Sequence, residues 1–325
     1  MRTALSLSTL LGIPVTIEHI RANRPKAGLR PQHLTAVKAL KEICGAEVEG
    51  MAVDSRRIAF RPGRVKPGNY FFDVGTAGSV TLILQALLPP LALTPGPSRI
   101  KLRGGTHVPW SPSYHYLAEV FLSTLALMGI KTAVRLETWG WYPKGGGALE
   151  IDIHPSEMLT PLVLDRLWEP EQVHVLCASS NLPRHILERE KYRIQEILPE
   201  RLKAQYELAE GVSIGQGNMV FIAAQKGPAA AGFSSLGARG KPAEQVAEEA
   251  VNSFFSFLNS GAAVDEHLGD QILPYLALAP GRSEVLVQGV SSHLRTNLWV
   301  VNQFMPSRLI LEEERGLARV VKAAR

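Results

Sequence analysis

The sequence predicts an α/β protein with a large domain of repeated α/β modules and a smaller domain inserted into it. The 325 residues are 46% hydrophobic and 20% charged, which is ordinary for a globular chain and long enough for one large or two smaller domains. An order of strand, helix ending in glycine and two strands occurs twice, about a hundred residues apart. The character of the chain changes near residue 183 and changes back near residue 262, which predicts the insertion.

The first occurrence of this order begins with residues 13–20, whose apolar and polar side chains alternate as in a strand. Residues 31–45 carry apolar side chains at helical spacing, with Pro31 in the first turn and Gly45 as terminator. Two short strands are predicted after this helix, in "AEVEGMAV" and "RIAFRP". Together these elements predict one α/β module with its helix on one side of a sheet.

The second occurrence repeats the order. Residues 98–104 predict a strand, and residues 111–129 predict a helix that again ends in glycine. Two further strands are predicted in "IKTAVRLE" and "GALEIDI". The repetition predicts stacked modules.

The inserted domain is predicted over residues 183–261, between the two parts of the large domain, 1–182 and 262–325. Its first stretch, "PRHILEREKYRIQEILPERLKAQYELAEG", is charged and predicted to be helical. An apolar strand "NMVFIAAQ", a Gly/Ala-rich stretch at 227–242 and a helix "AEQVAEEAVNSFFSFLNSG" follow. The insertion is therefore expected to be a small α/β domain.

Positive charge is concentrated at the amino-terminal end. Residues 1–66 contain 12 Lys and Arg against 5 Asp and Glu, a net of +7, whereas the whole chain has 35 − 30 = +5. A clustered positive field favours a polyanionic partner such as nucleic acid. A solvated basic face is the other interpretation, and the charge pattern alone leaves both open.

Cysteine usage and hydropathy indicate a soluble, cytoplasmic protein. Cys44 and Cys177 are far apart and lie in no metal-ligand or disulfide spacing, which fits a reducing compartment. The apolar stretch 79–94 is interrupted by Pro89 and Pro90 and is too short to span a bilayer. No membrane segment is predicted.

Two polar motifs interrupt apolar surroundings. Gly75, Gly78 and Ser79 precede a predicted helix, where they form either an anion cradle or a tight packing turn. Asp270 and Gln271 lie inside the otherwise apolar "EHLGDQILPYLALA", either as an exposed helical stripe or as contacts to a purine or ribose. The motifs do not decide between these alternatives.

His293 lies between two serines and an apolar run. Ser291 or Ser292 is a good N-cap, so His293 is predicted at a helix amino terminus. The positive end of the helix dipole favours a neutral imidazole facing an anion, and a neutral imidazole is a nucleophile. Taken alone, such a histidine is also compatible with a capping or core role.

Six motifs in sequence order resemble the RNA 3′-terminal phosphate cyclase family along nearly the whole chain. They are "RANRPKAGLRPQHLTAVKALKEICGAEVEG", "GTAGS", "RGGT", "GWYPKGGG", "HLGDQ" and "SSHLRTN". The resemblance implies a large domain of units similar to the carboxyl-terminal fold of initiation factor 3, with an inserted domain of thioredoxin-like topology. It also implies ATP and a divalent metal, Mg²⁺ or Mn²⁺, and a partner RNA with a 3′-phosphate end.

The implied reaction converts the RNA 3′-phosphate to a 2′,3′-cyclic phosphodiester, with His293 as the nucleophile that forms a histidine-AMP intermediate. By the resemblance, the adenosine-contacting segment comprises His267, Leu268, Gly269, Asp270 and Gln271. Further nucleotide contacts are implied at Pro143 and Ser113. Phosphates of ATP or of the RNA end are implied to bind Arg2, Arg21 and Arg24.

The amino terminus departs from the family pattern. Family members have a strand and a "GEGGGQ"-like segment ahead of "LRTALSLS", whereas this sequence starts at "MRTALSLS". The resemblance assigns the metal-holding glutamate to that segment, so no metal ligand is predicted within the 325 residues. This departure also keeps open a second function, that of a non-catalytic RNA-binding or ribosome-assembly relative. A homodimer is compatible with either function.

Overall fold

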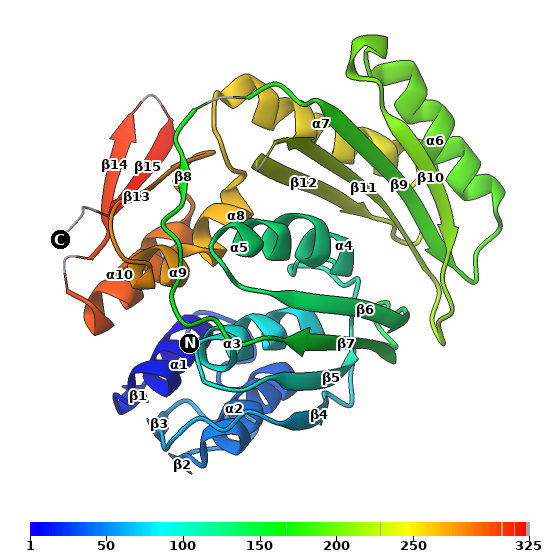
Figure 1. Cartoon of the computed structure of the whole chain (residues 1–325). Helices are drawn as coiled ribbons and strands as arrows, with labels where there is room; N and C mark the ends of the chain where they lie inside the picture. Colours follow the sequence, from blue (N-terminus) through cyan, green and yellow to red (C-terminus); the bar gives the residue numbers. More distant parts are fainter. Residues whose placement is uncertain (167, 228, 307, 315, 323–325) are drawn as a thin grey trace.

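Four β-sheets and the helices between them make up the structure, a computed structural model that describes residues 1–166, 168–227, 229–306, 308–314 and 316–322 (Figure 1). The strand orders are β1-β3-β2, β4-β5-β7-β6, β14-β15-β13-β8 and β10-β9-β11-β12. Each sheet is accompanied by helices, so the predicted α/β class is confirmed.

The first sheet is built by the predicted first module. Its elements are α1 (Arg2–Leu11), β1 (Val15–Ile17), α2 (Pro31–Cys44), β2 (Glu47–Glu49) and β3 (Ile58–Arg61). Helix α2 has its proline in the first turn, as predicted, and ends where Gly45 adopts a left-handed conformation with φ 65°. Both pairings in this sheet are antiparallel.

The second sheet contains the predicted second module. Its elements are β4 (Asn69–Asp73), α3 (Val80–Ala92), β5 (Ser98–Gly104), α4 (Tyr114–Tyr116), the π-helix η1 (Leu117–Leu122), α5 (Ser123–Leu127), β6 (Thr132–Thr138) and β7 (Gly147–Ile153). The helix predicted over 111–129 is present but widens into a π-turn in its middle. Strands β4 and β5 are parallel, and β7 runs antiparallel to both of its neighbours, β5 and β6.

The third sheet has the same strand order as the second. Its elements are β8 (Val163–Leu164), α8 (Glu266–Gln271), α9 (Leu273–Leu278), β13 (Ser283–Val287), α10 (Ser292–Phe304), β14 (Ile310–Glu314) and β15 (Leu317–Lys322). Strands β8 and β13 are parallel, as β4 and β5 are, and an antiparallel pair follows. The three strands of the first sheet, β1-β3-β2, correspond to β5-β7-β6 of the second sheet and to β13-β15-β14 of the third. Strand β1 therefore takes the place of β5 and β13.

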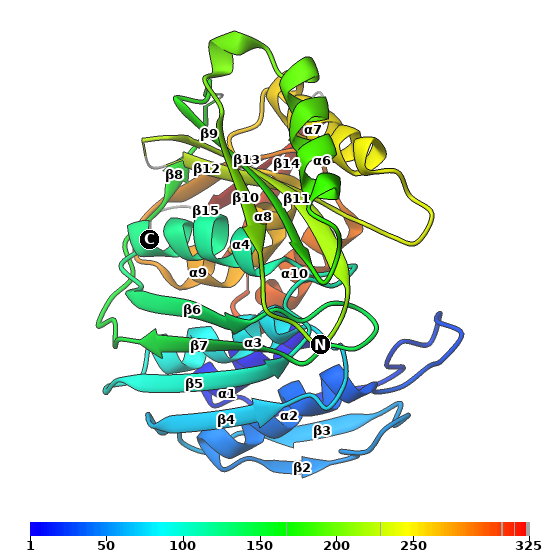
Figure 2. The ribbon, with the colours of Figure 1, turned by 90° about the vertical axis from the view of Figure 1, so that its right-hand side faces the viewer.

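The fourth sheet interrupts the third unit between β8 and α8. Its elements are β9 (Gln172–Ser180), α6 (His185–Ile197), the short 3₁₀-helix η2 (Glu200–Leu202), β10 (Gln205–Glu210), β11 (Gly217–Lys226), β12 (Ala229–Leu236) and α7 (Ala243–Ser260). Helices α6 and α7 pack against each other and against these strands (Figures 1 and 2). An apolar core of its own lies between sheet and helices.

In this region the sheet starts ahead of the predicted insertion, and one helix prediction needs correction. Strand β9 pairs with β10 and β11, so the fourth sheet begins upstream of the boundary predicted at residue 183. The stretch predicted as helical over 183–211 contains strand β10. Helix α6 ends because Leu198 precedes Pro199, and a residue before proline disfavours the helical conformation. Beyond this break, the chain pairs in parallel with β9.

Strand β12 lies in the Gly/Ala-rich stretch. Its side chains are small because the strand packs closely against the second unit. A Cβ on Gly232 would lie 2.7 Å from Cγ2 of Val120, in helix η1 of the second unit. The sheet therefore approaches the second unit too closely for larger side chains.

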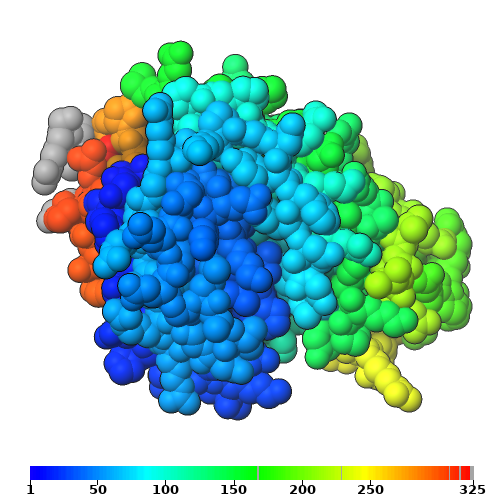
Figure 3. All heavy atoms as spheres, turned by 90° about the horizontal axis from the view of Figure 1, so that it is seen from below, coloured from blue at the N-terminus to red at the C-terminus, as the bar shows by residue number. Residues whose placement is uncertain are grey.

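Helices of different units pack together in the interior. Helix α1 contacts α2, α3 and α10, and one apolar core continues through the first three units. Figure 3 shows the amino-terminal part, in blue, at the centre of the lower face. Among the described residues, no helix is long and apolar enough to cross a membrane.

Candidate active site

Three helices from distant parts of the sequence meet through a chain of polar contacts. On α1, Thr3 donates from Oγ1 to Oδ1 of Asn297 on α10, over 2.6 Å. Asn297 donates from Nδ2 to Oδ1 of Asp270 on α8, over 3.2 Å. The guanidinium of Arg2 lies 4.0 Å from the same carboxylate oxygen. Asp270 therefore joins both ends of the chain to α8.

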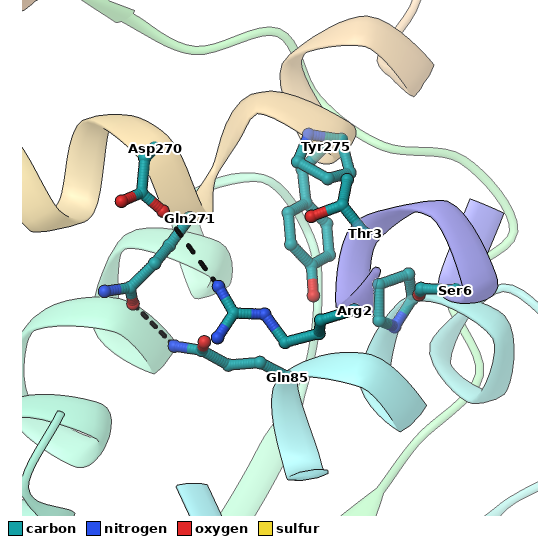
Figure 4. A pocket seen from close by; sticks show the side chains of 9 residues that line it. Arg2, Thr3, Ser6, Gln85, Asp270, Gln271 and Tyr275 are labelled. Atoms are coloured by element: carbon teal, nitrogen blue, oxygen red, sulfur yellow. Dashed lines mark hydrogen bonds and ion pairs between the residues drawn. The ribbon is translucent and has the colours of Figure 1, made fainter. Parts of the chain in front are cut away.

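The side chain of Asp270 also lines a small cavity (Figure 4). Gln85 on α3 donates from Nε2 to Oε1 of Gln271 over 2.6 Å, which holds the Gln271 side chain in place. The cavity has a volume of about 10 Å³, the size of one water molecule and not of a nucleotide. Its lining consists of Arg2, Thr3, Ser6, Gln85, Pro89, Asp270, Gln271, Pro274 and Tyr275. A nucleotide would therefore have to bind outside this cavity.

The side chain of Arg2 is largely buried, and its guanidinium has no close partner for all of its N–H groups. Its side chain is 28% exposed, and burial lowers the pKa of the guanidinium, while nearby Asp270 opposes that shift. Burial also raises the pKa of Asp270, against the influence of Arg2 and His293. A guanidinium has five N–H donors, and the 4.0 Å separation from Asp270 exceeds a hydrogen bond. Arg2 therefore retains donors suited to an oxyanion such as phosphate.

His293 is the second residue of α10. Ser291 caps the helix, as predicted, because its hydroxyl accepts the backbone N–H of Leu294 over 3.1 Å. The imidazole is exposed and lies near enough to Asp270 to influence its pKa. Asn297 follows one helical turn later, so the helix that holds the Asp270 contact also presents the imidazole. The arrangement offers an exposed imidazole within electrostatic reach of Asp270, the carboxylate that lies 4.0 Å from Arg2.

Helix α8 is fixed by an acidic cap. The Asp265 carboxylate accepts the backbone N–H groups of His267 and Leu268, both over 3.0 Å, and the hydroxyl of Tyr116 over 2.7 Å. The Tyr116 ring lies 6.4 Å from the imidazole of His267 between centroids, edge to face. His267 is exposed, whereas Leu268 is fully buried.

Close packing explains the glycine of this segment. A Cβ on Gly269 would lie 2.3 Å from Cγ1 of Val287 in β13. Leu268 and Gly269 therefore seat the segment on the third sheet. His267, Asp270 and Gln271 are the members with exposed or partly exposed side chains.

Ser113 and Pro143 lie in loops at the same end of the second sheet. The Ser113 side chain is buried, and its hydroxyl caps α4 by accepting the N–H of Tyr116 over 3.1 Å. The nucleotide contact at Ser113 stays a prediction, and in this structure the hydroxyl is enclosed and caps the helix. Pro143 is exposed and follows a cis peptide bond after Tyr142.

Three amides of the Gly75–Ser79 turn donate to side chains of the protein. Gly75 donates to the Asp73 carboxylate over 2.7 Å, and Ser79 donates to Oε1 of Gln32 over 2.9 Å. Gly78 donates to the hydroxyl of Thr76 over 3.2 Å. Of the two alternatives, the structure supports a packing turn over an anion cradle.

Arg21 and Arg24 lie in the loop that connects β1 to α2. Arg21 braces this loop by donating from Nη1 to the carbonyls of Lys26 and Gly28, over 2.5 and 3.3 Å. Burial, with the nearby Arg21 charge, lowers the pKa of His33 to about 4. His33 and Arg2 line one cavity of about 200 Å³, so Arg21 lies in the neighbourhood of Arg2. Arg24 is exposed on the same loop.

The sequence pattern of the RNA 3′-terminal phosphate cyclase family matches residues 1–310. The chain belongs to this family. Proteins named RNA 3′-terminal phosphate cyclase from Methanopyrus kandleri and Pyrococcus abyssi are 41% and 40% identical to it. These alignments cover 97% and 100% of this chain and 92% and 95% of the relatives. The predicted family and cyclase assignment are confirmed.

Other comparisons differ in strength. A protein of the same name from Koribacter versatilis is 42% identical, with 100% of this chain and 91% of the relative covered. Among solved structures, the enolpyruvyl transferase NikO from Streptomyces tendae aligns over 100% of this chain and 46% of its own. Its TM-score of 0.40 and identity of 12% are too low to bear on fold or function.

Several residues of this cyclase-family site were not predicted. Asn297 follows His293 at helical spacing, and Gln85 is a polar residue in the apolar helix α3, so both carried a local signal. Asp265 precedes the helical pattern as a typical N-cap residue, whereas Thr3 and Tyr116 carried no such signal. Their roles depend on contacts with partners far away in the sequence.

A metal held by protein ligands alone does not fit the donor set. Among the described residues, no three His, Cys, Asp or Glu side chains gather closely enough to hold an ion. Asp270 is already engaged by Asn297 and lies beside Arg2. The steps proposed below are therefore derived from the protein side chains and the substrates.

Proposed function

We propose that this chain uses ATP to convert an RNA 3′-phosphate into a 2′,3′-cyclic phosphodiester, through a histidine-AMP intermediate and an adenylylated RNA end. The observation that carries this proposal is the exposed His293 at the start of α10, within electrostatic reach of Asp270, which lies 4.0 Å from Arg2. Membership in the cyclase family supports the reaction class.

In the first step, a ring nitrogen of His293 attacks the α-phosphorus of ATP. A phosphorus–nitrogen bond forms, the bond to the bridging oxygen breaks, and pyrophosphate leaves. Arg2 stabilises the negative charge that develops on the phosphates, because its guanidinium retains N–H donors. Covalent catalysis of this kind divides one difficult displacement into easier ones.

The adenosine and the RNA are held by the surrounding segments. His267 and Gln271 on α8 are proposed to contact the adenosine, with Gln271 oriented by its bond from Gln85. Pro143 offers an exposed apolar surface to the base. Arg24, on the loop that Arg21 braces, is proposed to bind an RNA phosphate.

In the second step, an oxygen of the RNA 3′-phosphate attacks the phosphorus of the histidine-bound AMP, and the imidazole leaves. In the third step, the neighbouring 2′-hydroxyl attacks the former 3′-phosphate phosphorus and expels AMP, which closes the ring. The hydroxyl is already adjacent to its target, so effective molarity favours closure over hydrolysis. A DNA end lacks this hydroxyl and would be adenylylated without being cyclised.

We also propose a domain division for this activity. The three units of matching strand order would form the large domain, similar to the carboxyl-terminal fold of initiation factor 3. The unit from β9 to α7, residues 172–260, would be the inserted domain of thioredoxin-like topology. The shared strand orders and the separate apolar core of the fourth sheet support this division.

The test is incubation with α-labelled ATP and Mg²⁺ or Mn²⁺ in the absence of RNA. We expect an acid-labile protein-AMP adduct that disappears in His293→Ala. His185→Ala is the matched control, because His185 is an exposed histidine on α6 of the inserted unit. Addition of 3′-phosphorylated RNA should discharge the adduct and give a cyclic end, whereas 3′-phosphorylated DNA should stop at the adenylylated form.

Two results would contradict the proposal. An adduct that persists in His293→Ala would assign the nucleophile to another residue. No adduct in the native chain, together with salt-sensitive RNA binding that is indifferent to ATP, would favour the non-catalytic RNA-binding protein.

A further inference from the structure

Trp110 is an aromatic side chain held almost entirely in solvent. It is 97% exposed, the most exposed of the large apolar side chains among the described residues. Its backbone has φ 60°, a left-handed conformation that bulky residues rarely adopt. An unfavourable backbone that presents an apolar ring to water gives the fold no evident benefit, and such features cluster where proteins bind ligands.

The loop beneath Trp110 is firmly anchored. The backbone N–H groups of Thr106 and His107 both donate to the carbonyl of Gly140, over 2.9 and 3.0 Å. The His107 ring stacks on Trp139, with centroids 4.4 Å apart and planes 12° apart. Trp110 therefore projects from a rigid base, which lowers the entropy cost of holding a ligand.

Trp110 lies close in sequence to elements that contact the proposed nucleotide site. Trp110 lies three residues before the cap of α4, the helix whose Tyr116 contacts His267 and Asp265. An isolated parallel β-bridge between His107 and Trp141 joins this loop to the loop between β6 and β7. The residues that follow Trp141 include the exposed Pro143 and Tyr142, which is 67% exposed.

We propose that Trp110 is a stacking platform for a base of the RNA near its 3′-phosphate end. This inference rests on the proposed function and adds a residue that positions the RNA through a base, without touching the reacting atoms. Stacking on an aromatic ring suits RNA ends because it accepts any base. It leaves the 2′-hydroxyl and the phosphate free to reach the reaction centre.

The test compares Trp110→Ala and Trp110→Phe with the native chain. The dissociation constant of a short 3′-phosphorylated RNA is measured at fixed salt without ATP, and RNA-independent protein-AMP formation is measured separately. We expect Trp110→Ala to bind RNA about 5- to 150-fold more weakly, Trp110→Phe to recover much of the affinity, and adenylylation to be unchanged. Tyr192→Ala is the control, since Tyr192 is 64% exposed on α6.

An RNA with the three 3′-terminal bases removed and its sugar-phosphate chain intact separates stacking from other effects. On this RNA we expect the native chain and Trp110→Ala to bind equally. A Trp110→Ala affinity within twofold of the native value, or an equal loss on intact and abasic RNA, would overturn the inference. A base-dependent loss in a chain that forms no AMP adduct would leave the stacking role standing while the proposed catalytic function fails.

Discussion

At the scale of single residues, Glu190 shows how burial changes the chemistry of a carboxyl group. It is fully buried on α6, where Oε1 accepts from the side chain of Asn218. Its other oxygen, Oε2, has no hydrogen-bond partner among the described residues. Burial raises its pKa to about 8, although the bond from Asn218 opposes the shift. Glu190 is therefore protonated in the folded chain at neutral pH.

We predict that Glu190→Gln stabilises the chain at alkaline pH. The folded pKa of about 8 exceeds the unfolded value of 4.5, so the folded state binds more protons between these limits and stability falls as pH rises through them. The native free energy of unfolding should fall relative to Glu190→Gln by roughly 1.4 kcal/mol per pH unit in this window. Urea unfolding at several pH values measures it, with the exposed Glu188→Gln on the same helix as control. Parallel pH profiles for the native chain and Glu190→Gln would refute the assignment.

At the scale of elements, α8 places the candidate site on the third sheet. Its six residues are too few for a stable isolated helix, so packing determines its position. Gly269 provides that packing, because a side chain there would overlap Val287. Gly269, which lacks a side chain, thus allows the close packing that positions the polar residues of α8.

We predict that Gly269→Ala destabilises the chain by about 1–3 kcal/mol, the usual cost of overpacking. On helix propensity alone, this substitution would stabilise by about 1 kcal/mol, so the sign separates packing from propensity. Thermal unfolding measures the effect, and Gly269→Ala combined with Val287→Ala should recover part of the loss caused by overlap. Gly68→Ala is the control, since a Cβ at Gly68 meets nothing nearer than 3.6 Å. A Gly269→Ala chain at least as stable as the native one would contradict the prediction. It would show that Val287 in β13 moves aside for the added methyl group at little cost in stability.

At the scale of the whole molecule, an aromatic cluster joins the fourth sheet to the second. Nε2 of His107 lies 3.1 Å from Nδ1 of His115, and both rings lie beside Trp139. The fourth sheet closes on this cluster through glycines, since a Cβ on Gly217 would lie 2.3 Å from the Trp141 ring. Burial lowers the pKa of both histidines, that of His115 to about 4.

We predict that acid weakens the molecule through this cluster. The unfolded chain takes up a proton on His115 near pH 6.5 and the folded chain only near pH 4, so stability falls as pH is lowered between these values. In His115→Gln, this dependence should decrease by roughly 1.4 kcal/mol per pH unit. Urea unfolding from pH 7 to pH 4 measures it, with the exposed His154→Gln as control. An unchanged acid profile in His115→Gln would exclude the cluster as the cause.

The sequence by itself determined several local elements and the family. Periodic apolar side chains and terminal glycines predicted α2, α7 and β5 closely, because these signals act between near neighbours. The order of six motifs identified the family. The serine cap placed His293 at the start of α10.

Only the tertiary structure decided which residues share a site. The meeting of Arg2, Asp270 and Asn297 depends on how α1, α8 and α10 pack, and no local pattern encodes a contact across 294 residues, such as that of Thr3 with Asn297. Strand β10 was mistaken for helix for the same reason, since pairing with β9 overrides local preference. Local pattern fixes how a segment folds, whereas side-chain burial and pairing between distant segments fix what it contacts.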